Sequence, residues 1–327
     1  MNITEQLTKH LRRFAIGFAL ALPSIAVYAA FPEKPLTIVV PTAPGGGNDA
    51  MARIIGQKLS QLLGQTVIVD NKAGANGAIA SEYVAHATPD GYTILFGYIA
   101  THAMNPALQK LRYDPVADFE PIGLVATSPV LMVVNPDAGV KDVADFLSQA
   151  RANPAKFSYA SAGNGTAPHF AAELFKLVTG VSILHVPYKG SGPAMTDTLA
   201  GQTQLMFPSL IAASSHVKAG KLKALAVAGA RRSATLPNVP TLKEAGVDGV
   251  DVTQWYGLFA PARTPKPIVA QLNAALNTVL SDKEIIARLA AQGSDVETST
   301  PEQFGSLVKS ELIKWRGVVQ KAKLVAD

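Results

Sequence analysis

The chain has 327 residues, of which 48% are hydrophobic, with no cysteine and a formal net charge of +5. This length and apolar content allow two lobes with real cores, and they exclude disordered and collagen-like chains. The lack of cysteine excludes disulfides and zinc–thiolate sites, and the basic residues are too scattered to form the dense stripe of a nucleic-acid-binding surface.

The N-terminal segment predicts export. Basic residues precede an apolar run over residues 14–27, and small residues follow it. This pattern is typical of a secretory signal peptide, here residues 1–29, cleaved near Ala29 or Ala30. An uncleaved membrane anchor is the alternative, but the run is shorter than the roughly 20 residues that span a bilayer. We therefore expect a periplasmic mature protein.

After the signal peptide, short β-rich runs alternate with helical patterns, which is typical of an α/β protein with mostly parallel sheets. Strands are expected over residues 36–40, 66–69 and 92–96, with helices over 50–63 and up to about residue 87.

A long buried strand over residues 130–134 predicts a change of lobe, after which the pattern restarts. Helices are expected over 141–152 and 168–178, after Pro193 and near 211–219, and strands before Ser161 and over 181–186, 203–207 and 222–228.

Residues 252–261 look like a return crossing, and three helical segments then close the chain. Trp255 and Tyr256 are expected to stiffen this crossing rather than to contact a ligand. Two crossings predict an insertion architecture whose lobes hinge around a cleft. Lobe 1 then comprises residues 30–129 and 256–327, and lobe 2 comprises residues 130–255. The last helix has a clear start, because Thr300, Pro301 and Gln303 match a capping box.

Two strand-to-helix junctions have the same glycine-rich build. The first spans residues 38–49 and the second residues 157–166, and neither turn contains lysine. Backbone N–H groups and the positive end of a helix dipole hold an anion in such turns without a side-chain cation. Two such turns predict two halves of a clamp for one acidic small molecule. The alternative for each is a tight connection that binds nothing.

A nucleotide phosphate is the wrong anion for the first turn. Asn48 and Asp49 stand where a P-loop requires lysine and serine or threonine, and the final glycine of the dinucleotide pattern is missing. Asp49 is expected to cap the first helix and Thr166 the second. His169, in the first turn of the second helix, is a ligand contact or packs inside the lobe.

The sequence offers little catalytic chemistry. The histidines show no metal-ligand spacing, and no Gly-x-Ser-x-Gly elbow occurs. We therefore predict no metal, no cofactor and no enzymatic activity.

Taken together, these residues resemble the Bug family, the extracytoplasmic solute receptors associated with tripartite tricarboxylate transporters. The matching segments run in order along nearly the whole mature chain and comprise residues 31–35, 40–49, 71–77, 89–93, 105–108, 159–169, 186–190 and 237–241. The resemblance implies a two-lobed periplasmic-binding-protein fold with two crossover strands. Such a protein closes on a carboxylated solute and delivers it to a membrane permease; we expect a monomer.

The resemblance also implies a site in which backbone N–H groups, hydroxyls and ordered water hold the carboxylate. The contacts carried onto lobe 1 are Thr42, Gly45, Gly46 and Asp49, with Ala73, Gly74 and Thr101 nearby. Those carried onto lobe 2 are Ser161, Gly163, Gly165 and Thr166, with Tyr188 and Ser209 at the edge.

Two other functions stay open at this point. One is an exported enzyme that acts on a carboxylated metabolite, with Asp49 and His169 as its candidate acid or base. The other is a ligand sensor for a membrane kinase. The sequence does not name the solute.

Overall fold

The computed structural model describes residues 31–325, so the predicted signal peptide lies outside the described residues. Within that range, no helix combines the length and the apolar character needed to cross a membrane.

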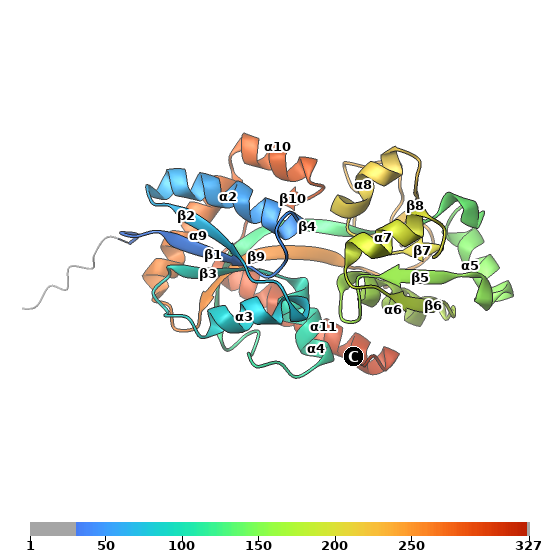
Figure 1. The fold of residues 1–327 in the computed structure, drawn as a ribbon, viewed down its shortest axis with the longest axis horizontal. Coiled ribbons are helices and arrows are strands. Elements are labelled where there is room, and N and C mark those ends of the chain that lie inside the picture. The colour runs from blue at the N-terminus through green and yellow to red at the C-terminus, as the bar shows by residue number, and fades with distance from the viewer. Residues whose placement is uncertain (1–30, 326–327) are drawn as a thin grey trace, which may run out of the picture. The chain divides into compact units, whose positions relative to one another are not determined.

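The first sheet has the strand order β2-β1-β3-β9-β4 (Figure 1). The strands are β1 (Leu36–Val40), β2 (Val67–Asn71), β3 (Thr93–Tyr98), β4 (Phe119–Val134) and β9 (Thr253–Pro261), and the short β10 (Asp295–Val296) pairs with β4. Strand β1 pairs in parallel with β2 and β3, whereas β9 runs antiparallel to β3 and β4.

The second sheet continues from the far end of β4. Residues 119–129 of β4 pair with β9, and residues 130–134 pair with strands of the second sheet. The second sheet contains β5 (Ser158–Ser161), β6 (Leu184–Pro187), β7 (Leu205–Met206) and β8 (Lys223–Ala228). Of these, β7 and β8 pair with β4. One long strand therefore belongs to both sheets.

The expectation of mostly parallel sheets holds for only part of each sheet. The pairs β1–β2, β1–β3, β5–β6 and β5–β7 are parallel, but every pair that involves β4 or β9 is antiparallel. Each sheet is thus mixed, because the long strands run against the strands of the strand–helix units.

Helices cover both faces of the sheets (Figure 1). On the first sheet, α2, α9 and α10 lie on one face, and α3, α4 and α11 lie on the other. Their bounds are α2 (Gly47–Leu63), α3 (Ala78–Ala85), α4 (Asn105–Leu108), α9 (Lys266–Leu280), α10 (Lys283–Ala291) and α11 (Pro301–Ala322). The second sheet carries α5 (Val143–Ala152), α6 (Ala167–Thr179), α7 (Ser191–Leu199) and α8 (Leu210–Lys218).

The last five residues of β4, 130–134, form a continuous apolar run, and the packing on their two faces explains why. Val130, Met132 and Val134 pack in the cluster that contains the aromatic side chains of α5 and α6. Leu131 and Val133, which point to the opposite face, pack with residues of α7 and α8. Both faces are therefore buried, and no position on this segment needs to be polar.

Helix α11 starts as predicted and ties the two sheets together. The Thr300 hydroxyl accepts from the Gln303 amide at 3.2 Å, and the Gln303 side chain accepts from the Thr300 amide at 2.9 Å. Further along, the buried Trp315 ring packs edge-on against Phe170 of α6, with ring centroids 5.2 Å apart. The C-terminal helix thus contacts a helix of the second sheet as well as the first sheet.

The sequence prediction missed the first eleven residues of β4. Pro121, Gly123 and Pro129 disfavour a strand, because proline lacks a donor and glycine packs no side chain. The strand accommodates the first two with shifts in its register against β9, between Pro121 and Gly123 and again between Leu124 and Ala126.

Substitution of Gly257 in β9 tests how closely α11 approaches the sheet. A Cβ atom built on Gly257 would collide with the Phe304 ring and lie 2.9 Å from the Gly123 carbonyl oxygen. We expect Gly257→Ala to lower the free energy of unfolding by about 3 kcal/mol, since this packing has no room for a methyl group. Urea denaturation monitored by circular dichroism measures the change.

The matched control is Gly317→Ala on α11, where a Cβ atom meets nothing within 4 Å. Here alanine should raise stability by about 0.5–1 kcal/mol, because the position is helical and open. Equal effects of the two substitutions would contradict the close packing at Gly257.

Candidate functional site

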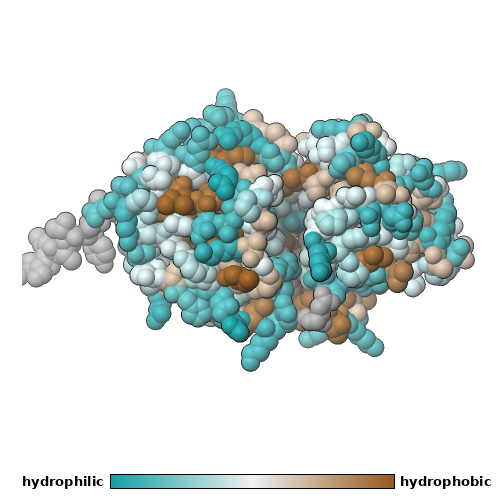
Figure 2. Space-filling model, viewed as in Figure 1, coloured by the Kyte–Doolittle hydropathy of each residue, from teal (hydrophilic) through white to brown (hydrophobic). Residues whose placement is uncertain are grey.

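A cavity of about 690 Å³ lies where the two sheets meet, and the surface in Figure 2 is hollowed there. Its walls come from the starts of four helices and from β3 and β9. The lining residues are Thr42, Ala43, Pro44, Gly45, Gly46, Gly47, Asn48, Asn76, Tyr98, Ala100, Ala162, Thr166, Ala167, Pro168, Gly190, Ser191, Gly192, Pro208, Ser209, Ile211, Ala212, Gln254 and Tyr256. Both predicted glycine-rich turns therefore contribute to one cavity.

The first turn is held by Asp49, but not as the helix cap that the sequence suggested. Gly46 is the N-cap residue and offers no side chain, and Asp49 lies three residues inside α2. Its Oδ2 accepts from the Gly45 amide at 2.9 Å. Gly45 has φ +82°, which favours glycine. The buried carboxylate thus fixes the turn from behind.

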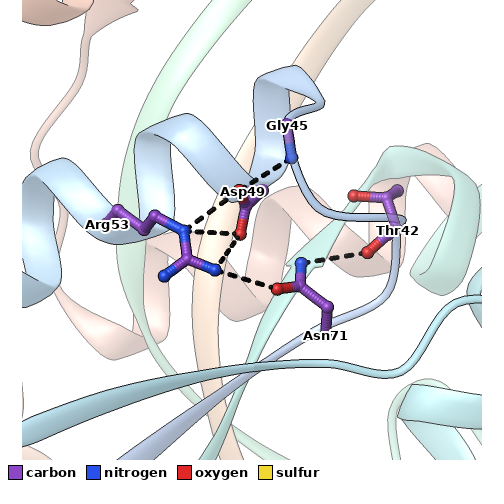
Figure 3. A network of polar contacts seen from close by, with 5 residues as sticks. All are labelled: Thr42, Gly45, Asp49, Arg53 and Asn71. Carbon is purple, nitrogen blue, oxygen red and sulfur yellow. Dashed lines mark hydrogen bonds and ion pairs between the residues drawn. The ribbon is translucent and has the colours of Figure 1, made fainter.

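Arg53 and Asn71 extend this contact to the other end of the turn (Figure 3). The Arg53 Nε donates to both Asp49 oxygens at 2.9 and 3.0 Å, and its Nη2 donates to Asn71 Oδ1 at 3.1 Å. Asn71 Nδ2 then donates to the Thr42 carbonyl at 3.1 Å. The charge of Arg53 is therefore directed to Asp49, and Arg53 does not line the cavity.

The pKa of Asp49 reflects this network. Burial raises the pKa, but the hydrogen bonds from Arg53, Gly45 and Asn71 outweigh it, so that the pKa lies below its ordinary value. Asp49 is therefore an ionised structural group, unsuited to act as a general acid at neutral pH.

Hydroxyl and imidazole groups hold the backbone of the second turn in place. Thr166 is the N-cap residue of α6, but its hydroxyl donates to the Gly163 carbonyl at 2.6 Å instead of capping the helix. Ser161 Oγ accepts from the Gly163 amide at 3.1 Å, and His169 Nδ1 accepts from the Gly165 amide at 3.3 Å. The turn is thus held without a charged residue.

Two more helices begin at the same cavity. Gly190, Ser191 and Gly192 at the start of α7 line it, as do Ser209 and Ile211 at the start of α8. The first-turn N–H groups of a helix have no partner within the helix, and the helix dipole places positive potential there. The N-termini of α2, α6, α7 and α8 therefore converge on one space.

The residues that line this cavity include no aspartate, glutamate, lysine, arginine or histidine. One wall is aromatic, since the rings of Tyr98 and Tyr256 stack with their centroids 6.5 Å apart. Burial raises the pKa of Tyr98 to about 12, so its hydroxyl stays protonated. Tyr256 donates to Gln254 Oε1 at 3.3 Å. The arrangement attracts an anion and offers no charged base, acid or metal ligand.

Five of the predicted contact residues line the cavity: Thr42, Gly45, Gly46, Thr166 and Ser209. The others do not, namely Asp49, Ala73, Gly74, Thr101, Ser161, Gly163, Gly165, His169 and Tyr188. Several of these have a structural use. Thr101 is fully buried and exchanges hydrogen bonds with the Tyr98 backbone at 2.9 and 3.1 Å. The Tyr188 hydroxyl donates to Asp197 at 2.7 Å. A ligand contact stays a prediction for every residue of the set.

Sequence reasoning missed Asn48, Asn76 and Gln254 as lining residues, and it assigned Tyr256 to the crossing alone. The signal for the last two is the two-residue period of a strand, which puts Gln254 and Tyr256 on one face of β9. Asn76 lies in the turn over residues 73–77, where the resemblance named only Ala73 and Gly74. It adopts φ +52°, and its Nδ2 donates to the carbonyl of Gly165 in the second turn at 2.8 Å.

Among residues 31–325, no cluster of three His, Cys, Asp or Glu side chains could hold a metal ion. His102 is a fully buried histidine with no part in such a cluster. Its ring stacks on Phe259 with centroids 3.9 Å apart, and burial lowers its pKa to about 3. This histidine is a neutral part of the core.

Known proteins are similar in sequence to this chain along most of its length. The family model described as tripartite tricarboxylate transporter family receptor matches residues 51–324. A UPF0065 protein from the tcbD–tcbE intergenic region of Pseudomonas sp. (strain P51) is 40% identical, with 97% of this chain and 96% of that protein covered. Protein BugT of Bordetella pertussis is 34% identical, with 98% of each chain covered.

Solved structures share the fold. MatC (Rpa3494) from Rhodopseudomonas palustris, with bound malate, is 37% identical, with a TM-score of 0.80 over 88% of this chain and 100% of that one. Rpa4515 of R. palustris, with adipate, is 36% identical, with a TM-score of 0.83 over 90% of this chain and 99% of that one.

Asp49→Asn tests the support of the first turn. At pH 7 we expect the free energy of unfolding to fall by about 1–3 kcal/mol, because the buried group loses its charge-assisted bonds. Since the folded pKa of Asp49 is lowered, its contribution is present above the unfolded pKa of about 3.9 and is lost as the pH falls through the folded pKa. The difference between the two proteins should therefore be constant from pH 5 to 8 and narrow below about pH 4.

Chemical denaturation at each pH measures this difference. Asp137→Asn, at an exposed position, is the control and should change stability by less than about 0.5 kcal/mol. A difference at Asp49 that stayed constant down to pH 2 would rule out the proposed ionisation.

Proposed function

Because this chain belongs to the tripartite tricarboxylate transporter receptor family, known also through its Bug members, we propose that it captures a carboxylated small molecule in the cavity between its two sheets. The fold is that of periplasmic binding proteins, and the chain is a solute-binding receptor, not an enzyme. The observation that carries the ligand class is the convergence of four helix N-termini on a cavity with no charged lining residue.

Such a cavity binds an anion with dipoles and hydrogen bonds alone. A helix N-terminus contributes about 0.3–1 kcal/mol to a nearby negative charge, and a hydrogen bond to a charged group about 1.5–3 kcal/mol. Several such donors make a side-chain cation unnecessary. Removal of residues 1–29, which hold three basic residues and one acidic residue, leaves a net charge of +3, and this charge adds long-range attraction for anions.

The relatives support the same ligand class. The R. palustris proteins with malate and with adipate are more than a third identical to this chain and superpose along most of it. Malate is a short hydroxy acid and adipate a longer, unsubstituted one, so the fold accommodates carboxylates of different length. We assign this chain to carboxylates as a class.

The further steps of the function follow from the family. We propose that residues 1–29 are a cleaved signal peptide, that the mature protein acts in the periplasm as a monomer, and that it delivers its ligand to the membrane permease of a tripartite transporter. The predicted lobes, residues 30–129 with 256–327 and residues 130–255, are the parts that would close on the ligand.

Calorimetric titration of the protein without residues 1–29 tests the ligand class. The probes are succinate, malate, adipate, citrate and benzoate. We expect saturable binding of at least one of them at one site per chain, because one cavity receives the helix N-termini. No heat and no thermal shift with any of these acids would contradict the proposal.

Ala212 provides a test of the mechanism. It lines the cavity in the first turn of α8. A carboxylate introduced by Ala212→Asp repels a bound anion at about 5 Å with about 3 kcal/mol at an effective dielectric constant of 20, which corresponds to about 100-fold weaker binding. Ala212→Asn has nearly the same shape without the charge and should cost less than about tenfold.

The exposed Lys189 is the control for a side-chain cation, since it lies next to the cavity turn at Gly190. Lys189→Ala should change the dissociation constant by less than about threefold. A large loss here, with Ala212→Asp tolerated, would show that a cation and not the helix N-termini holds the ligand.

A further inference from the structure

The turn between β2 and α3 has a backbone conformation that side chains rarely adopt. Four consecutive residues have positive φ, namely Gly74 at +134°, Ala75 at +47°, Asn76 at +52° and Gly77 at +90°. Glycine adopts such angles without steric cost, whereas they are unfavourable for alanine and, to a lesser degree, for asparagine. The turn therefore stores strain, which persists only where surrounding contacts hold it.

One set of contacts fixes the turn to the helices of the first sheet. Asn105, which is 1% exposed in α4, donates from Nδ2 to the Ala75 carbonyl at 3.3 Å, and its Oδ1 accepts from Gln109 at 3.0 Å. The buried Asn105 thus anchors the backbone of the turn. Neither of these bonds uses the side chain of Asn76.

The side chain of Asn76 reaches the second sheet instead. Its Nδ2 donates at 2.8 Å to the carbonyl of Gly165, in the turn between β5 and α6. Gly165 lies close to the first-sheet side, since a Cβ atom built on it would be 3.1 Å from Leu108 Cδ2 and 3.5 Å from Asn105 Oδ1. The amide of Gly165 donates to His169 of its own side at 3.3 Å. Its peptide groups are therefore held from both sides of the cavity.

The Asn76–Gly165 bond depends on how the two sides of the cavity lie. A shift of the sides beyond hydrogen-bond distance would break it, whereas the Asn105 and His169 bonds lie within one side each and would remain. The Asn76 donor already has an acceptor in the protein, so this bond needs no ligand. It therefore stabilises the arrangement in which the two sides meet, called here the closed arrangement.

We propose that Asn76 is a latch residue, whose bond to Gly165 holds the closed arrangement and so strengthens the binding of every ligand without contact to it. This inference rests on the proposed function and adds a positioning residue to it. The apparent dissociation constant is the intrinsic constant divided by the fraction of closed protein. Loss of the latch therefore weakens all ligands by one common factor.

Asn76→Gly removes the side chain and keeps a residue that adopts φ +52° readily. We expect it to weaken the binding of malate, succinate and adipate by the same factor, about three- to tenfold, which corresponds to one hydrogen bond. Calorimetric titration measures the three constants. A loss that differs among the acids would mark Asn76 as a ligand contact and overturn the latch, as would unchanged affinity for all three.

The matched control is Ala75→Gly, which relieves the strain at the neighbouring residue and retains the Asn76 side chain. Its affinity should stay the same or rise. A loss equal to that of Asn76→Gly would show that a more flexible turn, and not the missing bond, weakens binding, and would overturn the proposal.

A second measurement follows the latch without a ligand. Because the chain contains no cysteine, cysteines introduced at the exposed Gln61 of α2 and Lys218 of α8 carry spin labels on the two sides. Double electron–electron resonance should show a smaller closed fraction for Asn76→Gly than for the unsubstituted protein, and equal fractions would contradict the latch. Failure of the unsubstituted protein to bind any of the acids would count against the proposed function, while this measurement still tests the latch.

Discussion

The site depends on the first-turn N–H groups of four helices, of which only α8 has a side-chain cap, the Ser209 hydroxyl, whereas α2, α6 and α7 have none. Each helix leaves its first-turn donors without internal partners, and proteins usually cap them or expose them to water. Here the starts of α2, α6, α7 and α8 line one cavity. Every lining side chain is uncharged, so nothing in the wall competes with an incoming anion for these donors. The positive potential of the cavity is therefore a property of topology, because each of these helices follows a strand that ends at the cavity.

The charged and titratable groups nearby hold the turns in shape. Asp49 and Arg53 pair behind the first turn, and the pair reaches Thr42 through Asn71. Behind the second turn, Ser161 and His169 accept from backbone amides that would otherwise be free. Asp49, Ser161 and His169 thus satisfy the amides of Gly45, Gly163 and Gly165. These bonds fix the shape of both turns before a ligand arrives, which lowers the entropic cost of binding.

The sequence predicted the two turns and the strand–helix order because these depend on local patterns. A glycine-rich turn and an apolar run before a helical pattern are visible in the sequence itself. The orientation of a side chain cannot be read from the sequence in this way. Asp49 and Asn48 are neighbours, yet one turns back to the Gly45 amide and the other lines the cavity. Likewise, the resemblance placed Thr101 near the ligand, but Thr101 lies in the five-residue π-helix Ala100–Met104 and its hydroxyl donates to the carbonyl of Tyr98, the last residue of β3. Both hydrogen-bond partners lie within four residues, but the choice between them and the cavity depends on the packing around each side chain, which includes segments distant in sequence such as Asn71 at the first turn.

The donors at the cavity are divided between the two sheets, so the proposed closure of the lobes would bring them together around a ligand. Helix α2 belongs to the first sheet, and α6, α7 and α8 belong to the second, so neither sheet alone surrounds an anion. Contacts that join the two sides include the Asn76–Gly165 hydrogen bond and the packing of Ile211 on Gly47. A ligand that accepts from both sides adds its own bonds to these contacts and so favours the arrangement in which both sides meet. Because the ligand carries the charge and the protein wall carries none, separation of the two sides would divide the donors and leave no cation to retain the anion. With the closure proposed above, binding by dipoles alone would make capture and release depend on the same movement.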